Sequence, residues 1–182
     1  FVMVITGSFT ENSDIIRYGY SLFPKHWSLE AYKSIFRFPE AIVRSYGVSI
    51  LVTAVGTVLG LLIMSMCGYA LQRRELRHAN GITFFIYFTT LFSGGMVPWY
   101  MLITGMGMKD SLWALILPSM CSSFYILLTR NFMRQLPESL VESAKIDGAG
   151  DFKIFWRIVI PLSTPVIATI GLFLGLGYWN NW

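Results

Sequence analysis

Charged side chains are scarce in this 182-residue sequence, and four long stretches contain none. Asp, Glu, Lys and Arg make up 13% of the residues, against about 25% in soluble domains. The uncharged stretches are 45–72, 79–108, 111–129 and 158–182. Because a helix needs about 20 apolar residues to cross a bilayer, each stretch can span one. The composition argues against a soluble core and predicts an all-α polytopic membrane protein built as a helical bundle.

Residues that carry common enzyme chemistry are also few. The two histidines and two cysteines form no H-E-x-x-H and no C-x-x-C pattern. No Gly-Lys pair exists, which excludes the Walker A motif of ATP-binding loops, and no G-x-S-x-G elbow is present. Cys67 and Cys121 are interpreted as small packing residues. We therefore predict no catalytic residue, no metal site and no cofactor bound by this chain.

The uncharged stretches also lack the Asp, Glu, Lys and Arg side chains that proton- or ion-driven carriers place at mid-membrane. This absence argues against a proton-coupled carrier and against an intramembrane hydrolase. A carrier of neutral solutes stays open. If the protein moves a solute uphill, we expect the energy to come from another subunit.

The charges that do occur lie between the stretches. The net charge is +4, and Arg73, Arg74 and Arg77 fall in one short loop. Lys and Arg concentrate in short cytoplasmic loops, so this loop is predicted to face the cytoplasm. No basic stripe interleaved with aromatics is present, so we expect membrane lipid and not nucleic acid as a partner.

Alternation from that loop predicts a single transmembrane domain over 1–182. Its apolar start is too short to cross a membrane and is interpreted as the end of a first span whose beginning is missing. The predicted segments are the end of that span at 1–10, an external segment at 11–44, a span at 45–72, a cytoplasmic loop at 73–81, a span at 82–103, an external loop at 104–110, a span at 111–129, a cytoplasmic loop at 130–157 and a span at 158–178. Within the external segment, Ser28 is predicted to cap a short amphipathic helix.

Glycines recur at four-residue spacing in two of the stretches, as Gly56 with Gly60 and as Gly171 with Gly175. In lipid, such pairs let helix backbones approach closely. They mark either a subunit interface or packing within the chain's own bundle, and packing within the bundle is the commoner use.

The segment 137–161 has the most informative local pattern. Pro137 suits the first turn of a helix, and Gly148 is predicted to end that helix in a left-handed conformation. Asp151 is predicted to cap the next helix, and Pro161 to kink the span that follows. The pattern predicts a short helix across the cytoplasmic face between two spans. An ordinary connecting helix would fit the same residues.

This segment resembles the EAA loop of ABC importer permeases, which reads E-A-A, three residues, G, nine residues and I-x-L-P. Glu142, Ser143 and Ala144 are followed at this spacing by Gly148 and by 158–161. Two positions depart mildly, with a serine for an alanine and an isoleucine for a leucine. The motifs at 68–71, 93–98, 113–118, 146–149 and 179–180 resemble the carbohydrate-uptake (maltose-type) family, closest to its complex-oligosaccharide branch.

The resemblance implies a permease of six spans, of which this chain holds the end of the first and all of the second to fifth, with the sixth missing. It also implies a second permease subunit, a cytoplasmic ABC ATPase dimer that uses ATP and Mg²⁺, an extracytoplasmic solute-binding protein, a sugar or oligosaccharide substrate, and the cell membrane of a bacterium. The residues it implies for coupling to the ATPase are Glu142, Ser143, Ala144, Asp147 and Gly148, with Pro137 and Pro161 supporting the loop. Ala144 is expected to face the groove of the ATPase.

Two other functions fit part of the sequence. A facilitator or secondary carrier would share the apolar spans, and the EAA spacing argues against it. A scaffold subunit without a pathway would be excluded by loss of uptake on deletion. Trp99, Tyr100, Phe124 and Tyr125 are candidates for stacking on a sugar, although packing and lipid contact are the commoner uses of such aromatics.

Overall fold

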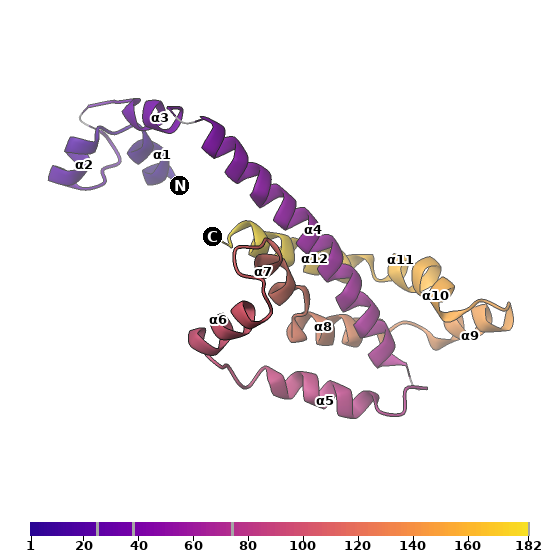
Figure 1. The fold of residues 1–182 in the computed structure, drawn as a ribbon. Coiled ribbons are helices and arrows are strands. Elements are labelled where there is room, and N and C mark those ends of the chain that lie inside the picture. Colours follow the sequence, from indigo (N-terminus) through magenta and orange to yellow (C-terminus); the bar gives the residue numbers. More distant parts are fainter. Residues whose placement is uncertain (25, 38, 74, 182) are drawn as a thin grey trace. The chain divides into compact units, whose positions relative to one another are not determined.

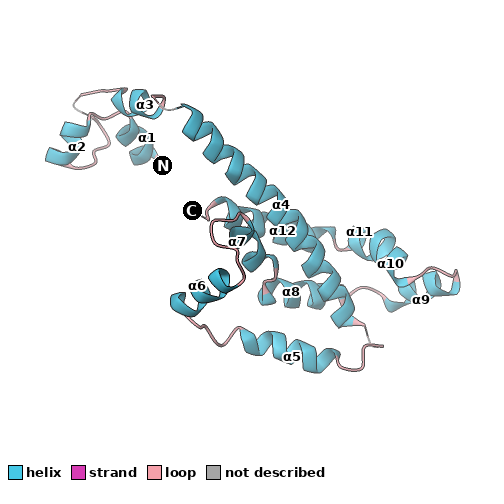
Figure 2. Cartoon of the chain, viewed as in Figure 1, coloured by secondary structure: helices cyan, strands magenta, loops and turns pink. Residues whose placement is uncertain are grey.

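The computed structural model describes residues 1–24, 26–37, 39–73 and 75–181. Lys25, Phe38, Arg74 and Trp182 lie outside the described residues, and with them one arginine of the predicted cytoplasmic loop. The chain is a succession of helices joined by turns (Figures 1 and 2). Helices make up 74% of it, and the described residues contain no strand, so the predicted all-α class is confirmed. The chain divides into two units, Phe1–Val48 and Ser49–Trp182.

The first unit holds the helices α1 (Val2–Ser8), α2 (Asn12–Tyr18) and α3 (Glu30–Ile35). The ring of Phe9 packs on those of Trp27 and Tyr32, with centroids 6.3 and 5.3 Å away. Helix α3 is the short helix that was predicted after Ser28. The Ser28 hydroxyl accepts the N–H of Glu30 at 3.1 Å, which satisfies one of the free amides at the start of that helix.

The second unit is built mainly of short helices. Helix α4 (Pro39–Gln72) begins in the first unit and continues into the second. The elements that follow are α5 (Ala79–Thr89), α6 (Met96–Gly105), α7 (Trp113–Ile116), η1 (Leu117–Met120), α8 (Ser123–Met133), α9 (Glu138–Ile146), α10 (Asp151–Ile154), the π-helical turn η2 (Phe155–Val159), α11 (Ile160–Leu162) and α12 (Thr164–Trp179). Among the described residues, α4 alone is long and apolar enough to cross a membrane as one helix. Two bent pairs, Trp113–Met120 with Ser123–Met133 and Asp151–Leu162 with Thr164–Trp179, raise the number to three if each is one span.

Helices α4 and α12 approach closely along stripes of buried residues spaced four apart. A Cβ atom placed on Gly56 would lie 2.5 Å from the Tyr178 ring, and one on Gly60 would lie 2.8 Å from Leu174. On the facing helix, a Cβ on Gly171 would lie 3.1 Å from Leu61. A Cβ on Gly56 or Gly60 would collide with α12, and Gly171 and Gly175 face Leu61 and Thr57 of α4, so both glycine pairs pack within the chain. The interpretation as internal packing is confirmed.

The segment predicted as a span at 82–103 is not one helix. Helix α5 ends at Thr89 and α6 begins at Met96, with an irregular stretch between them. Gly95 has a φ of 79°, which no helix accommodates. Pro98 then lies in the first turn of α6, where a missing N–H does no harm. A glycine pair followed by proline therefore divides an apolar run that is long enough to be a single helix.

The segments predicted as spans at 111–129 and 158–178 are bent where prolines occur. Pro118 lies in the 3₁₀ turn η1, between α7 and α8, and that pair bends by 41°. The second pair bends by 80° at Ser163. Pro165 has no N–H to donate to the Pro161 carbonyl, which instead accepts the Thr164 hydroxyl at 2.7 Å. The kink predicted at Pro161 therefore lies two residues later and involves two prolines.

Candidate functional site

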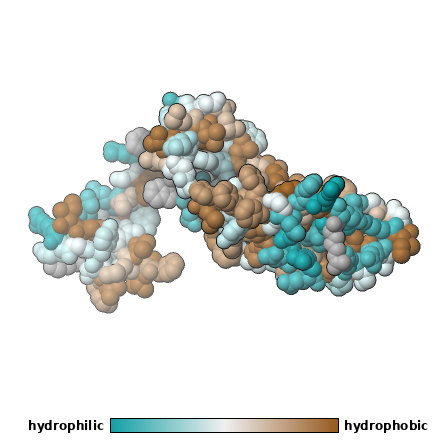
Figure 3. All heavy atoms as spheres, turned by 90° about the horizontal axis from the view of Figure 1, so that it is seen from below, coloured by the Kyte–Doolittle hydropathy of each residue, from teal (hydrophilic) through white to brown (hydrophobic). Residues whose placement is uncertain are grey.

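The short helix predicted between two apolar segments is α9. The Pro137 carbonyl accepts the N–H of Leu140 at 3.2 Å at its start, and the helix ends at Ile146. Glu138 lies in its first turn and Lys145 in its last, the placement that a helix dipole favours. In Figure 3, hydrophilic residues gather over the part of the second unit where Figure 1 places α9 and α10. Helix α9 begins after Pro137 and ends before Gly148, as predicted from the sequence.

The turn after α9 is held by two backbone hydrogen bonds. Gly148 has a φ of 76°, and its N–H donates to the Lys145 carbonyl at 3.0 Å. The N–H of Ala149 donates to the Ala144 carbonyl at 2.9 Å. This pair of bonds around a left-handed glycine is the Schellman arrangement. The predicted left-handed conformation of Gly148 is confirmed, and the turn fixes the direction in which the chain leaves α9.

One face of α9 packs against an apolar cluster formed by the surrounding elements. The buried members of the cluster are Tyr69, Met133, Ile154, Phe155 and Val159. Val141 and Ala144 of α9 are half-buried against it, and so is Ala149 of the turn. The expectation that Ala144 faces outward is therefore wrong: its side chain points toward the core of this chain, because it shares a helix face with Val141.

The opposite face of α9 is open. Glu142, Ser143 and Asp147 are exposed there, and the Ile146 side chain is 87% exposed. Ile146 therefore lies on the exposed face of α9 together with these polar residues. The sequence motif included Ile146, but it was not singled out as a contact residue.

Glu142 also lines an open cavity of about 360 Å³ beside α9. Arg134, Glu138 and Lys145 line the same cavity, so charges of both signs surround it. Three of the residues implied for coupling, Glu142, Ser143 and Asp147, therefore lie at the surface, whereas Ala144 supports α9 from within and Gly148 shapes its end.

Asp151 does not cap the helix it begins. The N-cap of α10 is Gly150, and no side-chain hydrogen bond caps this helix. The Asp151 carboxylate instead pairs with the Arg73 guanidinium, with 2.5 Å between Oδ1 and Nη2. Arg73 follows directly after α4, and its side chain is only 13% exposed. An arginine that is mostly buried needs such a partner, which explains why the carboxylate is drawn away from the helix terminus.

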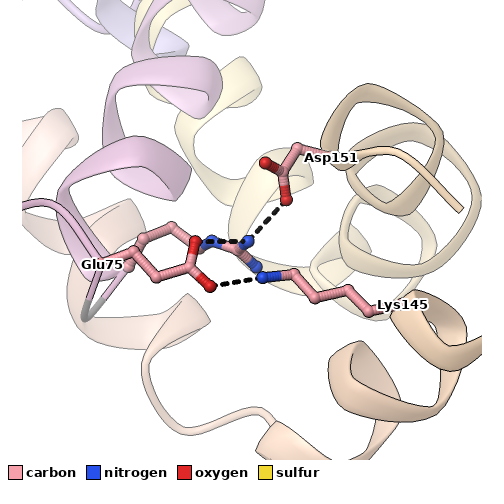
Figure 4. Close-up of polar contacts among 4 residues, drawn as sticks. Glu75, Lys145 and Asp151 are labelled. Carbon is pink, nitrogen blue, oxygen red and sulfur yellow. Dashed lines mark hydrogen bonds and ion pairs between the residues drawn. The ribbon is translucent and has the colours of Figure 1, made fainter.

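Asp151 and Arg73 belong to a larger set of four charged residues that we call the polar clamp: Arg73, Glu75, Lys145 and Asp151. The guanidinium of Arg73 also pairs with the Glu75 carboxylate at 3.2 Å, and Glu75 in turn pairs with the Lys145 ammonium group (Figure 4). These contacts, chiefly that with Lys145, lower the pKa of the Glu75 carboxyl below its usual range. Glu75 therefore stays ionised at neutral pH, and the clamp alternates in sign from Asp151 to Lys145.

Sequence reasoning missed the polar clamp as a unit. The Arg73 side chain counted only as a sign of cytoplasmic location, Asp151 only as a cap, and Glu75 and Lys145 had no role. The signal lay in their positions, since Arg73 and Glu75 follow an apolar helix whereas Lys145 and Asp151 flank the Gly148 turn. Nothing in a single sequence pairs residues that lie seventy or more positions apart.

Pro161 lies just beyond the cluster and shapes the segment that follows α10. Because it has no N–H, it cannot complete a helical bond to Arg157, and the π-helical turn η2 (Phe155–Val159) precedes it. Phe155 and Val159 both point into the apolar cluster. Pro161 therefore lies where the segment α10–η2 passes into the apolar helix α12.

Known proteins share the sequence pattern and the fold of this chain. Residues 46–181 match the family described as "Binding-protein-dependent transport system inner membrane component". The chain belongs to this permease family. Its members are transport components, and the EAA motif is typical of them.

Relatives within the family agree in sequence and in structure. The chain is 42% identical to Protein LplC of Bacillus subtilis and 42% identical to the polygalacturonan/rhamnogalacturonan transport system permease protein YtcP of the same organism. Both matches cover 100% of this chain, but 61% and 63% of those relatives. A crystal structure of a bacterial ABC transporter that imports the acidic polysaccharide alginate matches with a TM-score of 0.88 at 28% identity, over 99% of this chain and 64% of that one. The chain therefore spans about three fifths of the length of these family members.

Proposed function

We propose that this chain is part of the membrane-spanning permease subunit of an ATP-driven importer for a sugar or oligosaccharide. It supplies membrane-spanning helical segments of that subunit, of which α4 is long and apolar enough to cross as one helix. It contributes to the solute pathway and has no ATPase site of its own. Its partners are a second permease subunit, a cytoplasmic ABC ATPase dimer and an extracytoplasmic solute-binding protein, in the cell membrane of a bacterium.

The observation that carries this proposal is helix α9. It is a short helix at the family's EAA spacing, exposed on one face and packed on a cluster on the other. Glu142, Ser143, Ile146 and Asp147 supply the exposed contacts with the ATPase, while Gly148 sets the direction of the loop. When ATP closes the ATPase dimer, a rigid displacement of α9 moves the apolar segments attached to it, and packed bundles rock between two arrangements.

Purification of the complete transporter tests the proposal. The full-length permease alone is expected to hydrolyse no ATP, because this chain has no nucleotide-binding loop. Together with its partner permease, its ATPase and its binding protein in liposomes, it is expected to show sugar-stimulated hydrolysis and uptake. Uptake that needs neither ATP nor the ATPase would instead support a facilitator.

Labelling of single cysteines from either side of the membrane tests the topology. In a variant without Cys67 and Cys121, cysteines at His78 and Ser139 are expected to react only from the cytoplasmic side, and one at Lys109 only from outside. All three positions are exposed, so accessibility depends on the side of the membrane. If Ser139→Cys reacted with an impermeant reagent in intact cells, the proposed orientation of the chain in the membrane would be wrong.

A cavity beside the break between η1 and α8, lined by both polar and apolar residues, is the proposed place where this chain contacts sugar. It measures about 450 Å³, and its lining includes Ser119, Ser122, Tyr125 and Asn180. Irregular backbone at membrane depth is tolerated where it lines a cavity, and Ser122 lies in this break. Hydroxyls and amides suit the hydroxyls of a sugar ring, and the aromatic residues Tyr125, Phe173 and Tyr178 suit its apolar face.

Replacing Tyr125 by alanine is expected to lower the apparent affinity of transport for sugar by about tenfold, which corresponds to about 1.4 kcal/mol. The matched control is Phe124→Ala, because Phe124 is the neighbouring aromatic, is exposed and does not line this cavity. Uptake is measured against sugar concentration, with neutral and uronate-containing oligosaccharides that bind the solute-binding protein. If the two substitutions changed the apparent affinity equally, the cavity would not be part of the sugar pathway.

A further inference from the structure

We propose that the polar clamp fixes α9 to the cytoplasmic end of α4, so that a displacement of α9 reaches α4 as well as the two segments that adjoin α9 in the chain. This inference rests on the proposed function, in which α9 receives the motion of an ATPase. It assigns Arg73, Glu75, Lys145 and Asp151 as positioning residues. None of the four has a role in the EAA pattern.

The chain itself does not connect α9 to α4. Helix α9 is joined to α8 through 134–137 and to α10 through 147–150, whereas α4 ends at Gln72. Contacts through space must therefore carry any motion from α9 to α4. The described residues provide two kinds, the apolar cluster around Tyr69 and the polar clamp.

The polar clamp holds both sides of the turn that ends α9. Lys145 lies in the last turn of α9, and Asp151 is the first residue of α10. Both pair with residues that directly follow α4, Lys145 with Glu75 and Asp151 with Arg73. A turn held at two points can neither slide nor rotate freely against the end of α4.

The cluster beneath the turn lacks this directional control. Apolar burial is non-directional, so it keeps α9 on the surface without fixing its register. Arg73 connects the two sets of contacts, since its guanidinium carbon lies 5.4 Å from the centroid of the Tyr69 ring, and Tyr69 lies 5.3 Å from Phe155. An isolated exposed ion pair contributes little, but Arg73 is mostly buried and has three partners.

The end of α4 is also tied to the rest of the second unit. The Arg130 side chain of α8 donates from Nε to the Leu71 carbonyl at 3.1 Å, which satisfies one of the last carbonyls of α4. Farther along, α4 packs on α12 through Gly56 and Gly60. A displacement that reaches the end of α4 is therefore passed to α12, and the polar clamp makes α4, α9 and α12 move together.

A double-mutant cycle in the complete transporter, with full-length permease in liposomes, tests this assignment. Arg73→Gln and Asp151→Asn are each expected to raise the ATP hydrolysed per sugar transported by about fivefold or more. The double variant is expected to match Arg73→Gln alone, because that substitution already removes the contact that Asp151→Asn breaks. The matched control is Arg77→Gln, an exposed arginine in the same loop that is not part of the polar clamp, and it is expected to keep the wild-type ratio.

The distance between α9 and α4 can be measured directly. A loss of overall stability alone would lower the amount of protein without broadening this distance. Spin labels at the exposed residues Ser139 on α9 and Val58 on α4 are expected to give a narrow distance distribution in the wild type and a broad one in Arg73→Gln. Purified amount and ATPase co-purification are expected to stay unchanged.

The outcomes separate the two proposals. A wild-type transporter without sugar-stimulated hydrolysis would contradict the proposed function itself. A functional wild type whose Arg73 and Asp151 variants keep its ratio and its distances, or whose double variant shows the sum of the two single effects, would overturn the polar clamp as a route to α4.

Discussion

Leucine in place of Gly56 is expected to leave little assembled protein in the membrane. A Cβ atom at this position would lie 2.5 Å from the Tyr178 ring, so the side chain of α12 or its backbone must move. Tyr178 is buried, and its hydroxyl donates to the Ile116 carbonyl at 2.7 Å, so turning the ring away breaks a hydrogen bond. Overpacking costs about 1–3 kcal/mol, and the lost bond about 1 kcal/mol more. Membrane content and thermal stability of the purified permease measure the effect.

Gly47 supplies the control on the same helix. A Cβ on Gly47 would meet no described atom within 4 Å, so Gly47→Leu is expected to leave the amount and the stability near those of the wild type. Adding Tyr178→Ala to Gly56→Leu frees the space that the leucine needs and is expected to recover part of the protein. If Gly56→Leu matched Gly47→Leu in both measurements, α4 and α12 would not pack through this stripe.

The glycine stripe shows which part of the fold the sequence could predict. Spacing of small residues by four identifies a face of close approach, and uncharged runs identify apolar segments, since both depend on local chemistry alone. The run at 79–108 did not reveal its own break, because length and hydropathy count residues without regard to backbone conformation. The break was nevertheless encoded in Gly95 and Pro98, which were used as a family motif and not as helix breakers.

The candidate site divides in the same way. The ends of α9 and the left-handed Gly148 follow from neighbouring residues, so local rules predicted them. The inward orientation of Ala144 depends on which face of α9 meets the cluster around Tyr69. The role of Asp151 depends on Arg73, which lies 78 positions earlier in the chain. Both of these depend on long-range packing, which no local pattern encodes.

Valine in place of Gly148 is expected to reduce uptake by about tenfold or more while the protein still inserts and pairs with its partner. Gly148 has a φ of 76°, a conformation that costs an ordinary L-residue about 1–2 kcal/mol and a β-branched one more. The alternative is to leave this conformation and lose the bonds from Gly148 to Lys145 and from Ala149 to Ala144. Either response tilts α9 and draws Asp151 from Arg73. Uptake and co-purification of the ATPase are the measurements.

Two substitutions attribute this effect to the backbone. A Cβ on Gly148 would meet no described atom within 4 Å, so a clash does not explain a loss, and Gly148→Asn is expected to fall between wild type and Gly148→Val because asparagine tolerates the left-handed region better. Gly150→Ala, at a φ of −69° and also with open space around it, is expected to stay near wild type. If valine at 148 transported as well as alanine at 150, the turn would not determine how α9 is held, and α9 would be only a connecting helix. The graded order of valine, asparagine and glycine is expected because the same backbone conformation that ends α9 also places Asp151 against Arg73.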